Sequence, residues 1–300
     1  MRAIALPRTQ IRGGTDDGTD GPGRSSADSM LSGSGLAPSP VQTSAVRMAT
    51  IQTGLLVVEL ALEPWGAAQA GLLEQLPAEE QSRILRYRRD ADRYRSLAAA
   101  LLPRLLISHQ RAQPLAQIHI ERGPTGKPFY PADPQLHFNL SHSGQFVALA
   151  LGTSPVGVDV EQVRPTRDWD AIAKRFFTVE EQQWLARFDN AERRHRFVAL
   201  WSRKESLLKA TGEGIAGGLS SFCAIAEDHA EIEIDHRGQR WFLRSYPALT
   251  GYGLALCSGA PGLPQPLQAQ VRAAQFLDDI NPAIATLVAM PRVAADAKAP

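Results

Sequence analysis

Apolar and polar residues alternate most regularly at residues 156–161, which read Val-Gly-Val-Asp-Val-Glu. A period of two predicts a β-strand with the three valines on one face and Gly157, Asp159 and Glu161 on the other. Residues 145–151, just before this segment, are almost all apolar. Such a run predicts a buried strand, so the acidic strand follows a central part of a sheet.

The rest of the chain alternates between helical and strand periodicity. A first strand is predicted at residues 55–60, followed by a long helix over 90–110 in which Pro103 predicts a kink or a break. A helix over about 191–211 ends before Gly212, since glycine commonly closes helices. Further helices are predicted after residue 66, from Pro77, over 168–176 and over 179–188, and further strands at 117–120, 136–140, 222–226, 232–235, 241–246 and 252–258.

This order of elements predicts an α+β protein with two similar lobes, residues 49–154 and 155–259. The acidic strand then begins the second lobe and lies at the lobe interface, where ligand sites are common. Residues 1–48 are rich in small and polar residues without periodicity, which predicts a disordered N-terminal extension. Because the first strand pattern closely follows Met48, we also hypothesise that translation starts there. Residues 260–300 are predicted to form a loosely ordered tail.

Composition narrows the class of protein. The 300 residues are 44% hydrophobic with a net charge of +1, which gives no indication of binding to nucleic acid or to a membrane surface. Cys223 and Cys257 are interpreted as free thiols, because no Cys/His spacing typical of zinc accompanies them. No apolar run is long enough to span a bilayer and no signal-peptide core is present, so a cytoplasmic protein is expected.

Three carboxylates are the candidate metal ligands. Asp159 and Glu161 share one strand face and can converge on one hard cation, although a solvated acidic edge strand gives the same pattern. Glu205 and Lys209 lie one helical turn apart, which is also the spacing of an ordinary surface ion pair. Glu205 shares the apolar stripe of Trp201, and so points toward the protein. Together these residues favour a divalent metal that holds a phosphorylated substrate.

Candidate phosphate contacts lie in two turns of the first lobe. Ser141 and His142 end a predicted strand, where their side chains and the following amides could hold phosphate oxygens. Taken alone, the same residues are more typical of a polar hairpin turn. Lys127 lies in a stiff Gly-Lys-Pro turn and is read either as a phosphate contact or as a solvated loop lysine. No P-loop, dinucleotide fingerprint or kinase signature is present.

Taken together, these motifs resemble the 4′-phosphopantetheinyl transferases of the surfactin-type (Sfp-like) class. The resemblance covers about residues 50–258 and leaves out both ends of the chain. The matching segments, in family order, are residues 92–97, 126–128, 138–143, 157–161, 175–177 and 201–206, with Lys209 and residues 212–214 after them.

The resemblance implies a two-lobed, pseudo-twofold α+β monomer with its active site between the lobes. Such an enzyme moves the phosphopantetheine arm of coenzyme A to a serine of an acyl, peptidyl or aryl carrier protein, requires Mg²⁺ and releases adenosine 3′,5′-bisphosphate. This is the activity of a holo-[acyl-carrier-protein] synthase, in fatty-acid, polyketide or nonribosomal-peptide synthesis. The residue roles carried over by matched position are Asp159, Glu161 and Glu205 for the metal, Lys209 for the pyrophosphate, and Arg95, Lys127, Ser141 and His142 for the adenosine bisphosphate end.

For the chemistry, Asp159, Glu205 and Lys209 are the expected catalytic residues, and Glu205 is a candidate base for the carrier serine. Glu181 is a second candidate base, although Thr178 three residues before it also fits a capping box. Two rival functions remain open at this point. One is a non-catalytic coenzyme A or nucleotide-binding protein, and the other is a magnesium-dependent phosphohydrolase.

Overall fold

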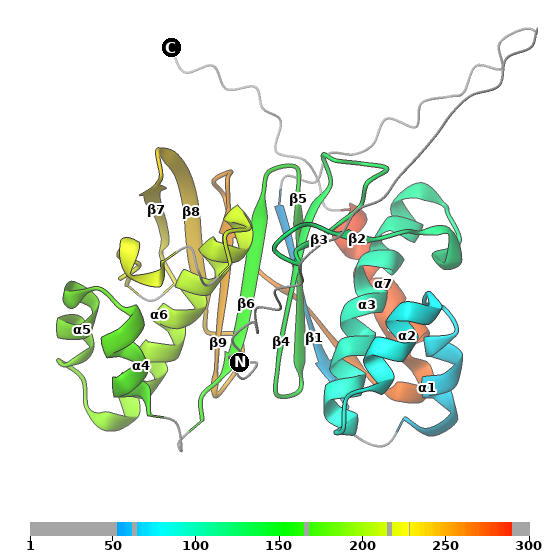
Figure 1. Ribbon diagram of the computed structural model, residues 1–300, viewed down its shortest axis with the longest axis horizontal. Coiled ribbons are helices and arrows are strands. Elements are labelled where there is room, and N and C mark those ends of the chain that lie inside the picture. Colours follow the sequence, from blue (N-terminus) through cyan, green and yellow to red (C-terminus); the bar gives the residue numbers. More distant parts are fainter. Residues whose placement is uncertain (1–52, 62–64, 165–167, 215–217, 228, 290–300) are drawn as a thin grey trace, which may run out of the picture. The chain divides into compact units, whose positions relative to one another are not determined.

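The computed structural model describes residues 53–61, 65–164, 168–214, 218–227 and 229–289. The predicted disordered extension, residues 1–48, lies outside these residues. Two four-stranded sheets carry the fold. Figure 1 shows their strands between two groups of helices. The first has the order β10-β1-β5-β4, with its strands at Leu267–Val271, Thr53–Leu60, Phe146–Gly152 and His137–Ser143. Strand β1 pairs with β10 in parallel and with β5 antiparallel, and β4 and β5 form an antiparallel hairpin.

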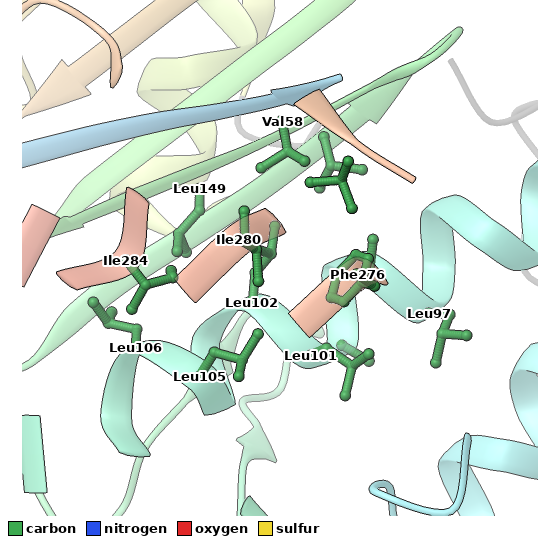
Figure 2. Close-up of a cluster of buried hydrophobic side chains, with 14 of the residues drawn as sticks. Val58, Leu97, Leu101, Leu102, Leu105, Leu106, Leu149, Phe276, Ile280 and Ile284 are labelled. Carbon is green, nitrogen blue, oxygen red and sulfur yellow. The ribbon is translucent and has the colours of Figure 1, made fainter. Parts of the chain in front are cut away.

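Helices cover one face of the first sheet. They are α1 (Gly66–Leu73), α2 (Ala78–Leu85), α3 (Asp90–Arg111) and α7 (Phe276–Ala289). In Figure 1, α3 and α7 lie beside the strands of this sheet, and Figure 2 shows their apolar side chains meeting those of Val58 and Leu149. Leucines at the i, i+4 spacing on α3, such as Leu101 and Leu105, supply the apolar stripe that this core requires.

The C-terminal part of the chain differs from the sequence-based prediction. Residues 267–289 form β10 and α7 instead of a loosely ordered tail. Phe276, Ile280 and Ile284 are almost fully buried and pack against α3, as Figure 2 shows. Phe276, Ile280, Ile284 and Leu287 follow the spacing of one helix face, so the sequence carries the signal of an amphipathic helix. Its docking on α3 depends on contacts with a distant part of the chain. Residues 290–300 lie outside the described residues.

The sequence predicts a kink or a break at Pro103, and helix α3 continues through this residue without a break. Proline removes one backbone donor from a helix. Here Pro103 itself is buried, and so are Leu102 and Leu106 on either side of it. Tertiary packing of α3 against the sheet and α7 therefore outweighs the local preference of proline.

The second sheet has the order β6-β9-β8-β7 and is antiparallel throughout. Its strands are Val156–Gln162, Tyr252–Ser258, Gln239–Tyr246 and Glu231–His236. The helices of this half are α4 (Trp169–Phe176), α5 (Val179–Leu185) and α6 (Asn190–Thr211). Figure 1 shows α6 beside β6 and β9, where Gly157 and Gly253 face it without side chains.

Two predicted strands are wrong. Residues 115–117 form a 3-10 turn, and the short pair β2 (Glu121–Arg122) and β3 (Pro128–Phe129) takes the place of a strand at 117–120. Residues 222–226 form no strand, although their apolar pattern predicts one. Their backbone groups bond to buried side chains instead: Phe222 O accepts from Lys204, Ala224 N donates to Glu181, and Ala226 O accepts from Arg203. Side chains thus replace the neighbouring strand that periodicity assumes.

The two sheets share a second apolar core. Leu55, Val57 and Ala148 of the first sheet pack with Val158 and Leu256 of the second. The predicted α+β class with two lobes is therefore confirmed, with β10 and α7 added to the first lobe. Within the part of the chain that the structure describes, no helix is both long and apolar enough to cross a membrane.

Candidate active site

The buried carboxylate of Asp159 is the centre of the candidate site. Asp159 and Glu161 lie on β6 and are only 3% and 7% exposed. Asp159 Oδ1 accepts hydrogen bonds from Lys209 Nζ at 2.6 Å and from Ser141 Oγ at 2.9 Å. Asp159 Oδ2 is buried and has no hydrogen-bond partner. A buried carboxylate oxygen without a partner is costly, so its presence indicates a site that is built to bind something.

Lys209 reaches this centre from the last turns of α6. Its ammonium also donates to Ser141 Oγ at 3.0 Å and to Val158 O at 3.2 Å. The approach depends on Gly157, because a side chain there would overlap the backbone of Ser206 and Ala210 on α6. Gly212, with a φ of 79°, then caps α6 in the left-handed region that glycine adopts readily. Local sequence thus places a helix end directly against the acidic strand.

The charges of the site influence one another strongly. Burial raises the pKa of the Glu205 carboxyl to about 7; Lys209 opposes this rise, whereas Asp159 and Glu161 add to it. Burial likewise raises the pKa of Glu161, with a further rise from Asp159. Burial alone would lower the pKa of the Lys209 ammonium, but Asp159 and Glu205 raise it above its ordinary value. Three carboxylates therefore share one electrostatic environment, and a cation placed among them is favoured.

The donor chemistry fits a hard divalent cation, because carboxylate oxygens are the ligands that Mg²⁺ prefers and Asp159 Oδ2 is free to bind one. Among the residues that the structure describes, however, no group of three or more Asp, Glu, His or Cys side chains is arranged to hold a metal ion. Asp159 is instead paired with the Lys209 ammonium. The predicted ligands are near one another, and their side chains would have to turn to share one ion.

Both carboxylate oxygens of Glu181, the second candidate base, already accept hydrogen bonds. The predicted capping box is present, because Glu181 Oε2 accepts from Thr178 N at 2.8 Å while the Thr178 hydroxyl caps Glu181 N. Glu181 Oε1 accepts from Lys204 Nζ at 2.7 Å and from Ala224 N at 2.8 Å. The side chains of Glu181 and Lys204 are completely buried. Glu181 therefore holds α5, α6 and the segment at Ala224 together.

The candidate phosphate contacts lie around the same centre but have different partners. Ser141 lies in the centre itself, whereas His142, one residue on, points to the opposite face of β4. Arg95 on α3 bonds to Gly144 O in the turn after β4 and to Asp92. Lys127 Nζ donates to Val156 O at 3.2 Å and to Ala210 O at 2.8 Å, and burial lowers its pKa to about 8. Ser141 and Lys209 contact Asp159 directly, whereas Arg95 and Lys127 each donate to a backbone carbonyl.

Two features of the region are not foreseen by the sequence analysis. Asn139 and Ser143 on β4 bond to the acidic strand, and their position two residues either side of Ser141 is the signal that identifies them. A pocket of about 340 Å³ opens beside the end of α6, lined by Glu213, His236, Arg237 and Trp241 among others. His236 and Arg237 both bond to Glu213 at 3.3 Å, which holds the β7–β8 turn against the helix end.

Comparison with known proteins assigns this site to a family. Residues 155–257 match the 4′-phosphopantetheinyl transferase superfamily, and residues 62–154 match the N-terminal domain of 4′-phosphopantetheinyl transferases. The 4′-phosphopantetheinyl transferase ffp of Bacillus subtilis is 34% identical over 196 residues, 65% of this chain and 87% of the relative.

Two further relatives agree with this assignment. The 4′-phosphopantetheinyl transferase Sfp of Bacillus subtilis (strain 168) is 33% identical over 189 residues, which cover 62% of this chain and 84% of the relative. The 4′-phosphopantetheinyl transferase psf-1 of Bacillus pumilus is 37% identical over 185 residues, 61% of this chain and 78% of the relative. The chain belongs to the 4′-phosphopantetheinyl transferases. The resemblance drawn from its motifs is confirmed, and with it the expected activity, phosphopantetheinylation of a carrier protein.

Proposed function

We propose that this chain is a magnesium-dependent holo-[acyl-carrier-protein] synthase. It moves the 4′-phosphopantetheine arm of coenzyme A to a serine of an acyl, peptidyl or aryl carrier protein and releases adenosine 3′,5′-bisphosphate. The observation that carries this proposal is the buried Asp159 carboxylate, with Lys209 and Ser141 on one oxygen and no partner on the other. We also propose that it acts as a monomer in the cytoplasm.

Asp159, Glu161 and Glu205 would hold the magnesium ion. When bound, the ion would neutralise charge on the pyrophosphate oxygens of coenzyme A. The raised pKa values of Glu161 and Glu205 support this assignment, because both carboxylates are destabilised by burial and by a neighbouring Asp159. The Lys209 ammonium already provides one positive charge among them.

Lys209 is proposed to bind the pyrophosphate and to stabilise the negative charge that develops on the leaving bisphosphate. Its ammonium is charged at neutral pH, since its pKa lies above the ordinary value for lysine. Ser141 and His142 at the end of β4, together with Arg95 and Lys127, are proposed to hold the adenosine bisphosphate end. Ser141 shares its hydroxyl with Lys209 and Asp159, so this contact would link the nucleotide to the charged centre.

Glu205 is proposed as the base that accepts the proton of the carrier serine hydroxyl. In the protein without metal, burial raises the pKa of this carboxyl to about 7, so the site itself makes Glu205 more basic than an exposed carboxylate. Glu181 is a poorer choice, since its carboxylate is fully buried and already accepts three hydrogen bonds.

The test is mass spectrometry of an apo carrier protein incubated with coenzyme A, Mg²⁺ and this protein. A gain of roughly 340 Da on the carrier, the mass of one phosphopantetheine, is expected. The gain should disappear when EDTA replaces Mg²⁺ and when Asp159→Ala is used. Coenzyme A binding without any gain in mass would indicate a non-catalytic binding protein, and phosphate release without a carrier would indicate a hydrolase. Either result would overturn the proposal.

A further inference from the structure

Strands β4 and β6 are edge strands of different sheets, yet they lie side by side. Side chains of β4 occupy the positions where backbone carbonyls of a neighbouring strand would lie. Three backbone amides of β6 that face β4 donate to these side chains. The three bonds are Val158 N to Asn139 Oδ1 at 2.9 Å, Val160 N to Ser141 Oγ at 3.2 Å, and Gln162 N to Ser143 Oγ at 3.1 Å.

The period of these contacts is two on both strands, as in a backbone ladder. Asn139, Ser141 and Ser143 are all buried. The amides they satisfy belong to a strand whose opposite edge is already paired with β9. A buried amide without an acceptor is destabilising, so these side chains stabilise β6 in its place beside β4.

The hydroxyl groups of the two serines also donate hydrogen bonds to the acids of β6. Ser141 Oγ donates to Asp159 Oδ1 at 2.9 Å, and Ser143 Oγ donates to Glu161 Oε2 at 3.3 Å. A hydroxyl has one proton and two lone pairs, so it can accept from an amide and donate to a carboxylate at once. Each serine therefore fixes the backbone of β6 and one oxygen of the acid next to it.

We infer that Asn139, Ser141 and Ser143 form a side-chain ladder that positions the acids of the transferase site. Asn139 and Ser143 are positioning residues, acting through Asp159 and Glu161. Asn139 sets the start of β6, beside the close approach of α6 at Gly157, and Ser143 sets the end that carries Glu161. The effect of the ladder on metal binding rests on the proposed function, whereas its effect on β6 does not.

The test compares Ser143→Ala, Ser143→Thr and Asn139→Ala with the natural protein. The matched control is Ser245→Ala on β8, which removes a buried serine hydroxyl that has no hydrogen-bond partner. Amide hydrogen exchange is measured by NMR at Gln162 and Val158. The affinity for Mn²⁺, as a probe of the metal site, is measured by its paramagnetic resonance signal on the folded protein.

We expect Ser143→Ala to speed exchange at Gln162, and Asn139→Ala to speed it at Val158, each by about tenfold or more. Ser143→Ala should also weaken Mn²⁺ binding by about tenfold, and Ser143→Thr, which keeps the hydroxyl, should restore both values. Ser245→Ala should change neither. A purely structural role would lower the melting temperature without changing Mn²⁺ affinity.

Unchanged exchange at Gln162 in Ser143→Ala and at Val158 in Asn139→Ala would overturn the ladder itself. Faster exchange with unchanged Mn²⁺ affinity in Ser143→Ala would overturn its role in positioning the acids. If Ser143→Ala does not fold, Asn139→Ala and Ser143→Thr still decide the question, because one shortens the ladder and the other preserves it. Failure of the carrier assay alongside the expected exchange rates would overturn the proposed function and leave the ladder standing.

Discussion

A methyl group at Gly157 should separate α6 from β6. The Cβ of an alanine there would lie 2.0 Å from Ser206 O and 2.4 Å from Ala210 N. Real Cβ contacts are essentially never shorter than 3.0 Å, so the Ser206 carbonyl must recede by at least about 1 Å. Both contacts are with backbone atoms of a helix, so no side chain can rotate away to relieve them.

The expected loss follows from this displacement. Overpacking of a rigid contact typically costs about 1–3 kcal/mol, and the rigidity of a helix backbone places Gly157→Ala at the upper end. Lys209 and Glu205 move with α6 while Asp159 stays on β6, which lengthens the Lys209–Asp159 contact of 2.6 Å. A misplacement of about 1 Å at a catalytic group can lower turnover by about 100-fold.

The assay pairs urea denaturation with the rate of transfer of phosphopantetheine to a carrier protein. The matched control is Gly71→Ala on α1, where nothing lies within 4 Å of the added Cβ. An alanine in an exposed helix should leave stability unchanged or raise it by up to about 1 kcal/mol, with normal activity. Natural stability and turnover in Gly157→Ala would refute the reasoning that this glycine sets the distance between helix and strand.

Further predictions concern the charges. Asp159→Ala should abolish transfer while circular dichroism stays unchanged, and measurable turnover would contradict its role. Glu205→Gln should abolish transfer, because an amide cannot accept the serine proton; a variant that keeps its turnover would exclude Glu205 as the base. In the protein without metal, the pKa of Glu205 is raised from 4.5 to about 7 by folding. The stability that this group contributes is therefore present below about pH 4.5 and lost as pH rises through about 7. Denaturation curves of Glu205→Gln should lack this pH dependence. Lys204→Met should cost about 3–5 kcal/mol because it leaves Glu181 charged and buried, and Glu181→Gln combined with it should recover part of that loss, as urea denaturation can show.

Patterns of residue types within a few positions of one another predicted much of the fold. The alternation at residues 156–161 specified β6 and the face that carries Asp159 and Glu161, because a strand allows only two faces. Thr178 and Glu181, three residues apart, specified the capping box at the start of α5. Where the sequence prediction was wrong, a distant partner was responsible: residues 222–226 bond to side chains of α5 and α6, and β10 with α7 docks on the first sheet.

The sequence by itself determined which residues could carry the chemistry, because the motifs and the strand periodicity each depend on residues that are neighbours in the chain. It could not determine which side chains would meet. The tertiary structure decided that Lys209 pairs with Asp159, which lies 50 positions earlier, and that Lys204 pairs with Glu181. It also decided that Asn139, Ser141 and Ser143 bond to β6. These contacts join elements far apart in the chain, and their geometry exists only once both sheets and α6 have packed.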